Sequence, residues 1–255
     1  HKPGVKANDH TDKVACQTCH ISEFARALPT KMRWDWSTAG QKKDGKPFKE
    51  KGPLGTPAYD TQKGNFTWEK NVRPQYFWYS GRIDAVSLKD PIDPTRPVAL
   101  NWPVGRPDDP NARIAPFKVH TGKQPYDTVN KTMLVPHLFG PPDSDAYWAK
   151  YDWKIALESG MKKAGLPFSG QFDFVETSYV FPTTHMVAPK EKSVSCNECH
   201  TQDNSRMANI QGVYLPGRDG NKVIEILGWA TVLGSFAGVL LHALGRAVSS
   251  RRKEG

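Results

Sequence analysis

Two short motifs constrain this chain more than any other feature of its sequence. Each has the pattern Cys-x-x-Cys-His, once as Cys16-Gln17-Thr18-Cys19-His20 and once as Cys196-Asn197-Glu198-Cys199-His200. Two thiols three positions apart lie on one helical turn, where they can add to the two vinyl groups of one porphyrin. The histidine that follows is then placed beneath the iron as its proximal ligand. We therefore predict two covalent haem c groups, attached by Cys16, Cys19, Cys196 and Cys199, with His20 and His200 as proximal ligands.

The alternatives for these motifs are a zinc site and a thioredoxin-like redox pair. Zinc needs four ligands in a closed site, and two separate cysteine pairs could in principle form a zinc ribbon. However, a histidine follows both pairs although only 8 of the 255 residues are His. All 4 cysteines belong to the motifs, so none remains for a disulfide or a catalytic thiol. The combination favours haem.

The composition predicts a core that is not built mainly from aliphatic side chains. The chain has 21 Gly and 21 Pro, and its hydrophobic share is 38%, below the usual level of about 45–50%. It nevertheless has 8 Trp, 8 Tyr and 11 Phe. We expect a mainly irregular fold with short α-helices organised around covalently bound haems, plus one C-terminal transmembrane helix.

Local patterns refine this expectation. Residues 37–66 resemble an exposed loop, residues 65–82 have the aromatic content of a small β-hairpin, and the proline-dense residues 86–117 are expected to be irregular. A helix is predicted around the first motif, and the best helix elsewhere runs from Ser144 to Ala164.

The C-terminal region predicts a membrane anchor. No Lys, Arg, Asp or Glu occurs from Ile226 to Gly245, and basic residues follow. About 20 such residues span a bilayer as a helix, and positive flanks stay in the cytoplasm. We predict a periplasmic dihaem domain over residues 1–222, a transmembrane helix over 223–248 and a cytoplasmic basic tail over 249–255, placed in a bacterial inner membrane. Haem attachment on the outer side of that membrane requires the same topology.

Two features of the predicted span point towards a neighbour in the membrane. Gly234 and Gly238 form a Gly-x-x-x-Gly pair, which allows another helix to approach closely. His242 lies near the cytoplasmic end, where a polar side chain usually faces protein. It either ligates a b-type haem shared with a partner or hydrogen-bonds to a neighbour or at the interface.

The net charge of +9 is consistent with a solvated basic surface or with a docking face for an acidic partner or anionic substrate. Nucleic acid is not an expected partner, because the aromatic residues fall in no nucleic-acid-binding motif.

Six histidines remain for the sixth position on each iron. A second histidine gives a low-potential carrier, methionine gives a higher potential, and an open position allows substrate chemistry. The predicted distal candidates are His185, then His120 and His10. His137 is as well explained by a structural role. This surplus of histidines suggests that some ligate haems on other polypeptide.

Three segments carry a resemblance to a known family. They are Ala15–Ile21 with the following Pro29–Lys31 and Trp34–Gly40, then Pro116–Asp127, and finally Thr184–Glu191 leading into Cys196. Over roughly residues 10–218 the chain resembles the C-terminal part of the octahaem tetrathionate reductase family. The resemblance implies a periplasmic multihaem cytochrome, mostly with two His ligands per iron and one lysine-ligated catalytic haem. This chain departs from the family in having two haem motifs rather than eight, so it matches the electron-carrying haems.

These observations lead to three hypotheses. The first is a membrane-anchored electron carrier that passes electrons between an integral membrane quinol-oxidising or cytochrome b subunit and further haem-bearing chains or domains. The second is an enzyme, as the C-terminal portion of an octahaem reductase acting on tetrathionate, nitrite or hydroxylamine; Lys118, Lys190 and Lys192 lie near ligand candidates there. The third is a structural subunit with idle haems. Whether the chain is an enzyme stays open, and the carrier is preferred.

Overall fold

The computed structural model of the chain describes residues 10–251 and divides into two compact units. The first unit contains residues up to 195 together with 209–211, and the second contains 196–208 and the residues from 212 onward. The first Cys-x-x-Cys-His motif lies in the first unit and the second motif lies in the second unit.

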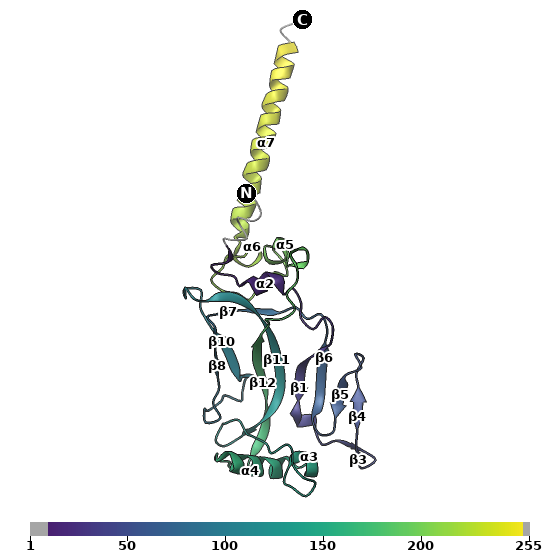
Figure 1. The fold of residues 1–255 in the computed structure, drawn as a ribbon. Helices are drawn as coiled ribbons and strands as arrows, with labels where there is room; N and C mark the ends of the chain where they lie inside the picture. Colours follow the sequence, from purple (N-terminus) through teal and green to yellow (C-terminus); the bar gives the residue numbers. More distant parts are fainter. Residues whose placement is uncertain (1–9, 252–255) are drawn as a thin grey trace. The chain divides into compact units, whose positions relative to one another are not determined.

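The first unit is built on an eight-stranded mixed sheet (Figure 1). Its strands follow the order β4-β5-β6-β1-β11-β12-β9, with β7 also paired to β11. A ribbon of β8 and β10 and a hairpin of β2 and β3 complete the β structure of the described residues. The strands are β1 (Thr30–Asp35), β2 (Lys42–Lys43), β3 (Lys46–Pro47), β4 (Lys49–Lys51), β5 (Pro57–Asp60), β6 (Gly64–Glu69), β7 (Gln75–Tyr79), β8 (Arg82–Ala85), β9 (Val98–Ala99), β10 (Asn101–Val104), β11 (Arg113–Asp127) and β12 (Phe172–Pro182).

Helices are short except at the C-terminal end. The first unit contains α2 (Cys16–His20), η1 (Trp36–Thr38), α3 (Tyr147–Lys150), α4 (Trp153–Ala164) and η2 (Lys190–Lys192). The second unit contains α5 (Cys196–Cys199), α6 (Pro216–Asp219) and α7 (Lys222–Arg251).

The long strand β11 organises the sheet. It pairs antiparallel with β12 over its last eleven positions, from Phe117 opposite Pro182 to Asp127 opposite Phe172. Its first residues pair with β7, and β1 runs parallel to its middle, with Trp34 opposite Gly122. Phe117 is completely buried and lies in a cluster with Ala115 and Val180.

The helix α4 covers its own part of the core. Asp152 caps its first turn by accepting a hydrogen bond from the Ile155 amide at 3.0 Å. Leu157 and Met161, one turn apart, pack against Leu134. The helix approaches the chain so closely at Gly160 that a Cβ atom there would lie 2.0 Å from the Val135 carbonyl oxygen, so only glycine fits.

The predicted fold class is therefore wrong. Instead of irregular chain organised around haem, the first unit is a mixed α/β structure with a large sheet and its own hydrophobic clusters. The physical reason is that its strands do not alternate polar and aliphatic residues. All six residues of β1 are half-buried, and β11 contains Pro116, Gly122 and Pro125, which read as loop residues in sequence.

The local predictions have mixed outcomes. Helix around the first motif, and helical structure between Ser144 and Ala164, are confirmed, although Tyr151 with φ of 56° interrupts the latter. Strands do occur within residues 65–82, but the hairpin is wrong because β6 pairs with β1 and β5 while β7 pairs with β11. The segments 37–66 and 86–117 contain strands rather than only loops.

Candidate functional site

The first motif forms α2, so Cys16 and Cys19 lie one turn apart and His20 follows directly. Cys16 is exposed and Cys19 is partly exposed, and neither is in a disulfide. Both thiols are thus accessible to a large reactive group. This is the geometry that two thioether bonds to one porphyrin require.

The sheet holds this helix in place through the start of β11. The Thr18 hydroxyl, which is buried, donates a hydrogen bond to the Ile114 carbonyl at 2.7 Å. The Ala15 amide donates to the same carbonyl at 3.0 Å. Ile21, directly after the motif, is completely buried. The backbone of the motif is therefore fixed by residues about a hundred positions away in sequence.

The imidazole of His20 is oriented by a backbone carbonyl. Its Nδ1 donates to the Ala188 carbonyl at 3.0 Å, and the Ala188 amide donates back to the His20 carbonyl at 2.6 Å. With the proton on Nδ1, Nε2 carries the lone pair that can bind a metal. A hydrogen bond of this kind is what normally fixes the ring of a metal-binding histidine and increases its basicity.

Residues 186–194 run along the first motif and are called the strap below. Besides the two bonds at Ala188, the Val194 amide donates to the Cys19 carbonyl at 2.8 Å. The short helix η2 lies between these contacts. Cys196 follows Val194 by two residues in the chain. The strap that contacts the first motif thus leads directly into the second.

The second motif is supported within its own unit. The helix α5 spans Cys196–Cys199, and the His200 amide continues it by donating to the Cys196 carbonyl at 2.8 Å. The Ser205 hydroxyl donates to the Cys199 carbonyl at 2.7 Å. Arg206 forms an ion pair with Glu198 at 2.6 Å. Cys196 is exposed and Cys199 is partly exposed, and neither is in a disulfide.

Both triads of residues fit haem c. Each offers two accessible thiols one helical turn apart, followed by a histidine. Between residues 10 and 251, no group of three or more His, Cys, Asp or Glu side chains converges as a metal site.

The distal candidates have different surroundings. His120 is buried on β11, and its Nδ1 donates to the Lys31 carbonyl at 3.1 Å, which leaves Nε2 as an acceptor. Its ring lies 4.6 Å from that of Tyr179, and burial lowers the pKa of His120 to about 4. His185 is exposed just after β12, and His10 is exposed at the start of the described chain. All three remain predicted ligands.

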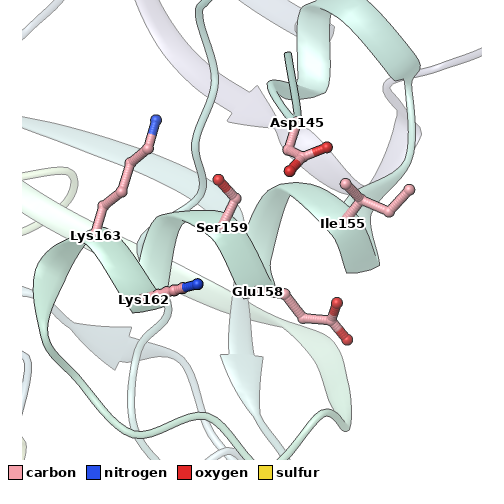
Figure 2. Close-up of a pocket in the computed structure, with 6 residues that line it drawn as sticks. All are labelled: Asp145, Ile155, Glu158, Ser159, Lys162 and Lys163. Carbon is pink, nitrogen blue, oxygen red and sulfur yellow. The ribbon is translucent and has the colours of Figure 1, made fainter. Parts of the chain in front are cut away.

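His137 has a structural environment. Its Nδ1 lies 3.0 Å from the Ser159 hydroxyl, and the Lys163 amine lies 3.0 Å from its Nε2. A cavity of about 530 Å³ opens beside Ser159 and Lys163 on α4 (Figure 2). It is lined by side chains of both charges and contains no predicted haem ligand. The lining residues are Asp145, Ile155, Glu158, Ser159, Lys162 and Lys163.

Sequence reasoning missed the residues that support the first motif. In the sequence, Thr18 is one of the two unspecified residues between the cysteines of the motif. Its small hydroxyl is the signal that could have indicated a hydrogen bond to the backbone. Ala188 acts through its backbone, so its side chain gives no signal. Arg26, whose guanidinium donates to the Met186 carbonyl in the strap, also had no motif.

The accessible cysteine pairs and the carbonyl-bound His20 define the class of protein as a c-type cytochrome. Residues 31–203 match the model of the family described as bacterial cytochrome c, and the chain belongs to this family. The solved structure of an octahaem cytochrome c from Shewanella oneidensis is similar, with 42% identity and a TM-score of 0.72. The match covers 79% of this chain and 46% of that one. A search of curated proteins gives no match.

The resemblance to the octahaem family is thereby confirmed. The chain is a multihaem c-type cytochrome related to that octahaem protein, and it spans less than half of the length of that protein. The match to the family model includes the second motif and begins after the first.

Proposed function

We propose that this chain is an electron carrier with two covalent haem c groups. Cys16, Cys19 and His20 hold the first, and the corresponding residues Cys196, Cys199 and His200 hold the second. Haem c supplies one-electron redox chemistry at its iron. The protein supplies the attachment, the orientation of the axial histidines and the surroundings that adjust the potential.

The observation that carries this proposal is the bond from Val194 to Cys19, at 2.8 Å. Two residues of fully extended chain span at most about 7 Å, so Cys196 cannot lie farther than that from Val194. The strap bonded to the first attachment sequence is consequently continuous with the start of the second. Electron tunnelling falls steeply with distance, so this short connection along the chain favours transfer from haem to haem.

A membrane anchor is the second part of the proposal. Among the described residues, one helix is long and apolar enough to cross a bilayer, over Lys222–Ser249 within α7, and its side chains are exposed. Arg246 and the basic residues after it would remain in the cytoplasm of a bacterial inner membrane, and the haem motifs would face the periplasm. This topology supports an integral membrane partner, either a quinol-oxidising or a cytochrome b subunit.

Further haems are the third part. The octahaem relative has more than half of its length outside the match. In our proposal, other haem-bearing chains or domains take the corresponding place here. The carrier then connects them with the membrane partner.

Quinol-driven reduction of the haems tests this function. Membranes that contain the full chain are supplied with quinol, and haem reduction is followed by absorbance. We expect reduction in the wild type, and its loss when residues 223–255 are deleted although both haems are retained. Equal rates for the truncated chain would contradict the membrane partner. Haem that is extracted from the denatured polypeptide by acid and acetone would contradict covalent attachment.

The second candidate function is a reductase, in which this chain is one portion of an octahaem enzyme acting on tetrathionate, nitrite or hydroxylamine. The identity of 42% to an octahaem cytochrome favours it. Lys118 on β11, whose amine donates to the Thr30 hydroxyl at 2.7 Å, is the lysine nearest to a ligand candidate in sequence. Oxidation of a reduced viologen dye by each substrate distinguishes the two, because a carrier without a catalytic haem gives no turnover.

A further inference from the structure

We propose that Arg26 is a positioning residue that sets the reduction potential of the first haem by keeping the Ala188 carbonyl on His20. This inference rests on the proposed attachment of haem at Cys16 and Cys19. Arg26 does not contact His20 by any described hydrogen bond, so it acts through the strap.

The first step concerns the anchoring of Arg26 itself. The adjoining segment is fixed, because the backbones of Phe24 and Val72 exchange two hydrogen bonds of 2.9 Å each. Phe24 is buried. The backbone that carries Arg26, two residues after Phe24, is therefore held in place. It donates through Nη2 to the Met186 carbonyl.

The second step concerns the backbone of the strap. Met186 has φ of +66°, in the left-handed backbone region that residues other than glycine rarely adopt. Such a conformation persists only where the surroundings hold it. The residue is 37% exposed, so core packing does not account for the conformation. The hydrogen bond from Arg26 is the described contact that holds this peptide group.

The third step links the strap to the iron ligand. Ala188 follows Met186 by two residues, and its carbonyl accepts the Nδ1 proton of His20 at 3.0 Å. An imidazole whose Nδ1 proton is held in this way is a stronger donor to iron and stabilises the oxidised state. If Met186 relaxes to a common backbone conformation, the Ala188 carbonyl turns away. The potential of the first haem then rises.

The direction in which the reduction potential changes distinguishes this role from a direct effect of the Arg26 charge on the haem. Loss of a positive charge near a haem stabilises the oxidised iron and lowers the potential. Loss of the hydrogen bond to His20 raises it. Arg113 provides the matched control, because it precedes Ile114, whose carbonyl contacts the first motif, but donates to the Thr11 carbonyl, outside the strap, at 2.8 Å.

The experiment is a potentiometric titration of the full chain with both haems, resolved into two components. For Arg26→Leu we expect one component to shift upward and the other to stay. Arg26→Gln, which keeps a donor but not the charge, should not shift upward. Arg113→Leu should leave the potential unchanged or lower it. An unchanged or lowered potential in Arg26→Leu would overturn the proposal.

A second set of variants tests the strap directly. Glycine adopts positive φ without a steric penalty, so adding Met186→Gly to Arg26→Leu should return the potential towards that of the wild type. Met186→Gly alone, which retains the Arg26 donor, should shift the potential less than Arg26→Leu does. A double variant that stays as high as Arg26→Leu would show that the backbone of residue 186 is not the link.

A measurement on the wild type keeps the proposal falsifiable if the variants do not fold. The Nδ1 proton of His20 should exchange slowly with deuterium in the paramagnetic NMR spectrum. Rapid exchange would overturn the hydrogen bond on which the proposal depends. Failure of the underlying function looks different, because the intact mass would then lack a haem at the first motif.

Discussion

The Val194 amide donates a hydrogen bond of 2.8 Å to the carbonyl of Cys19, two residues before the second attachment sequence begins. The cysteine that we propose as an anchor of one haem is therefore bonded to the segment that leads into the proposed attachment sequence of the other. This contact, with the pair at His20 and Ala188, joins the end of the first unit to its beginning.

Replacing Val194 with proline is expected to remove only this donor. Ser193 has φ of −72° and ψ of 160°, which suits a following proline. We expect the chain to retain both haems and to lose roughly 0.5–1.5 kcal/mol of unfolding free energy, the usual contribution of one hydrogen bond. Urea unfolding measures the loss, with Val194→Ala as the control that keeps the amide. An equal loss in both variants would contradict the assignment.

Asp127 should contribute stability that depends on pH. Its side chain is completely buried and accepts hydrogen bonds from Ser169, Asn130 and Val129. Burial alone would raise the pKa of this carboxyl group, but the hydrogen bonds hold it below its ordinary value. Since the folded pKa is lowered, the contribution is complete above the unfolded pKa and is lost as pH falls through the folded value.

Asp127→Ala is accordingly expected to cost roughly 2–4 kcal/mol near pH 7, and to cost less as the solution is acidified. Thermal or urea unfolding at several pH values measures the difference. The exposed Asp173 on β12 serves as the control. A penalty that stays constant down to pH values below the folded pKa would contradict the role of the charge.

Arg33 and Glu176 connect β1 with β12 through two parallel hydrogen bonds of 2.8 Å each. The Arg33 guanidinium lowers the pKa of Glu176, so this contribution also fades as pH falls through the lowered value. The side chains are 36% and 43% exposed, and solvent weakens the pair. A double-mutant cycle with Arg33→Ala and Glu176→Ala should give a coupling energy of about 0.5–1 kcal/mol that decreases with salt. Additive effects of the two substitutions would show that the pair contributes nothing.

The distal ligands are tested by spin state. His185→Ala is expected to turn one haem high spin and to raise its potential, because a strong donor to iron is lost. The same spectra test His120→Ala and His10→Ala. If the replaced histidine ligates an iron, one haem should again become high spin. His137→Ala, whose ring lies 3.0 Å from the Ser159 hydroxyl, is the control and should leave the spectra unchanged. Fully low-spin haem in His185→Ala would refute that ligand.

Deleting residues 223–255 should release a soluble protein that retains both haems. The reason is that the apolar helix is the described span long enough to cross a bilayer. Fractionation after a salt wash, followed by haem staining, measures the release. Retention of the truncated chain in the membrane fraction would require a second attachment to the membrane.

The membership of the chain in the multihaem cytochrome family could be recognised from the sequence, whereas its fold could not. Cysteine and histidine carry their chemistry in their identity and spacing, so the two motifs could be recognised without a structure. Strand β11 shows why the sheet could not. Gly122 lies where β1 approaches closely, and a Cβ atom there would be 2.9 Å from the Trp34 carbonyl oxygen. Pro116 and Pro125 indicate turns when the sequence is considered alone. In the structure they are paired positions of β11, with partners in β7 and β12 that the sequence does not reveal.

The partners of the first motif were beyond sequence reasoning for a different reason. Ala188 and Ile114 act through carbonyl groups, which every residue has. The contact of Arg26 with the Met186 carbonyl exists only in the folded chain, so the sequence gives no signal for it. A carbonyl gains a specific role from the path of the chain, and that path depends on the whole sheet.

The anchoring of Thr18 to Ile114 also imposes an order of events on biosynthesis. The chain is made from its N-terminus, so the first attachment sequence exists long before residue 114, and longer still before the strap that contacts Cys19 and His20. During this interval the helix α2 has no sheet to rest on. The two thiols are then open to whatever machinery modifies them. Covalent modification can precede closure of the fold, and the strap would then reach Cys19 and His20 after that modification.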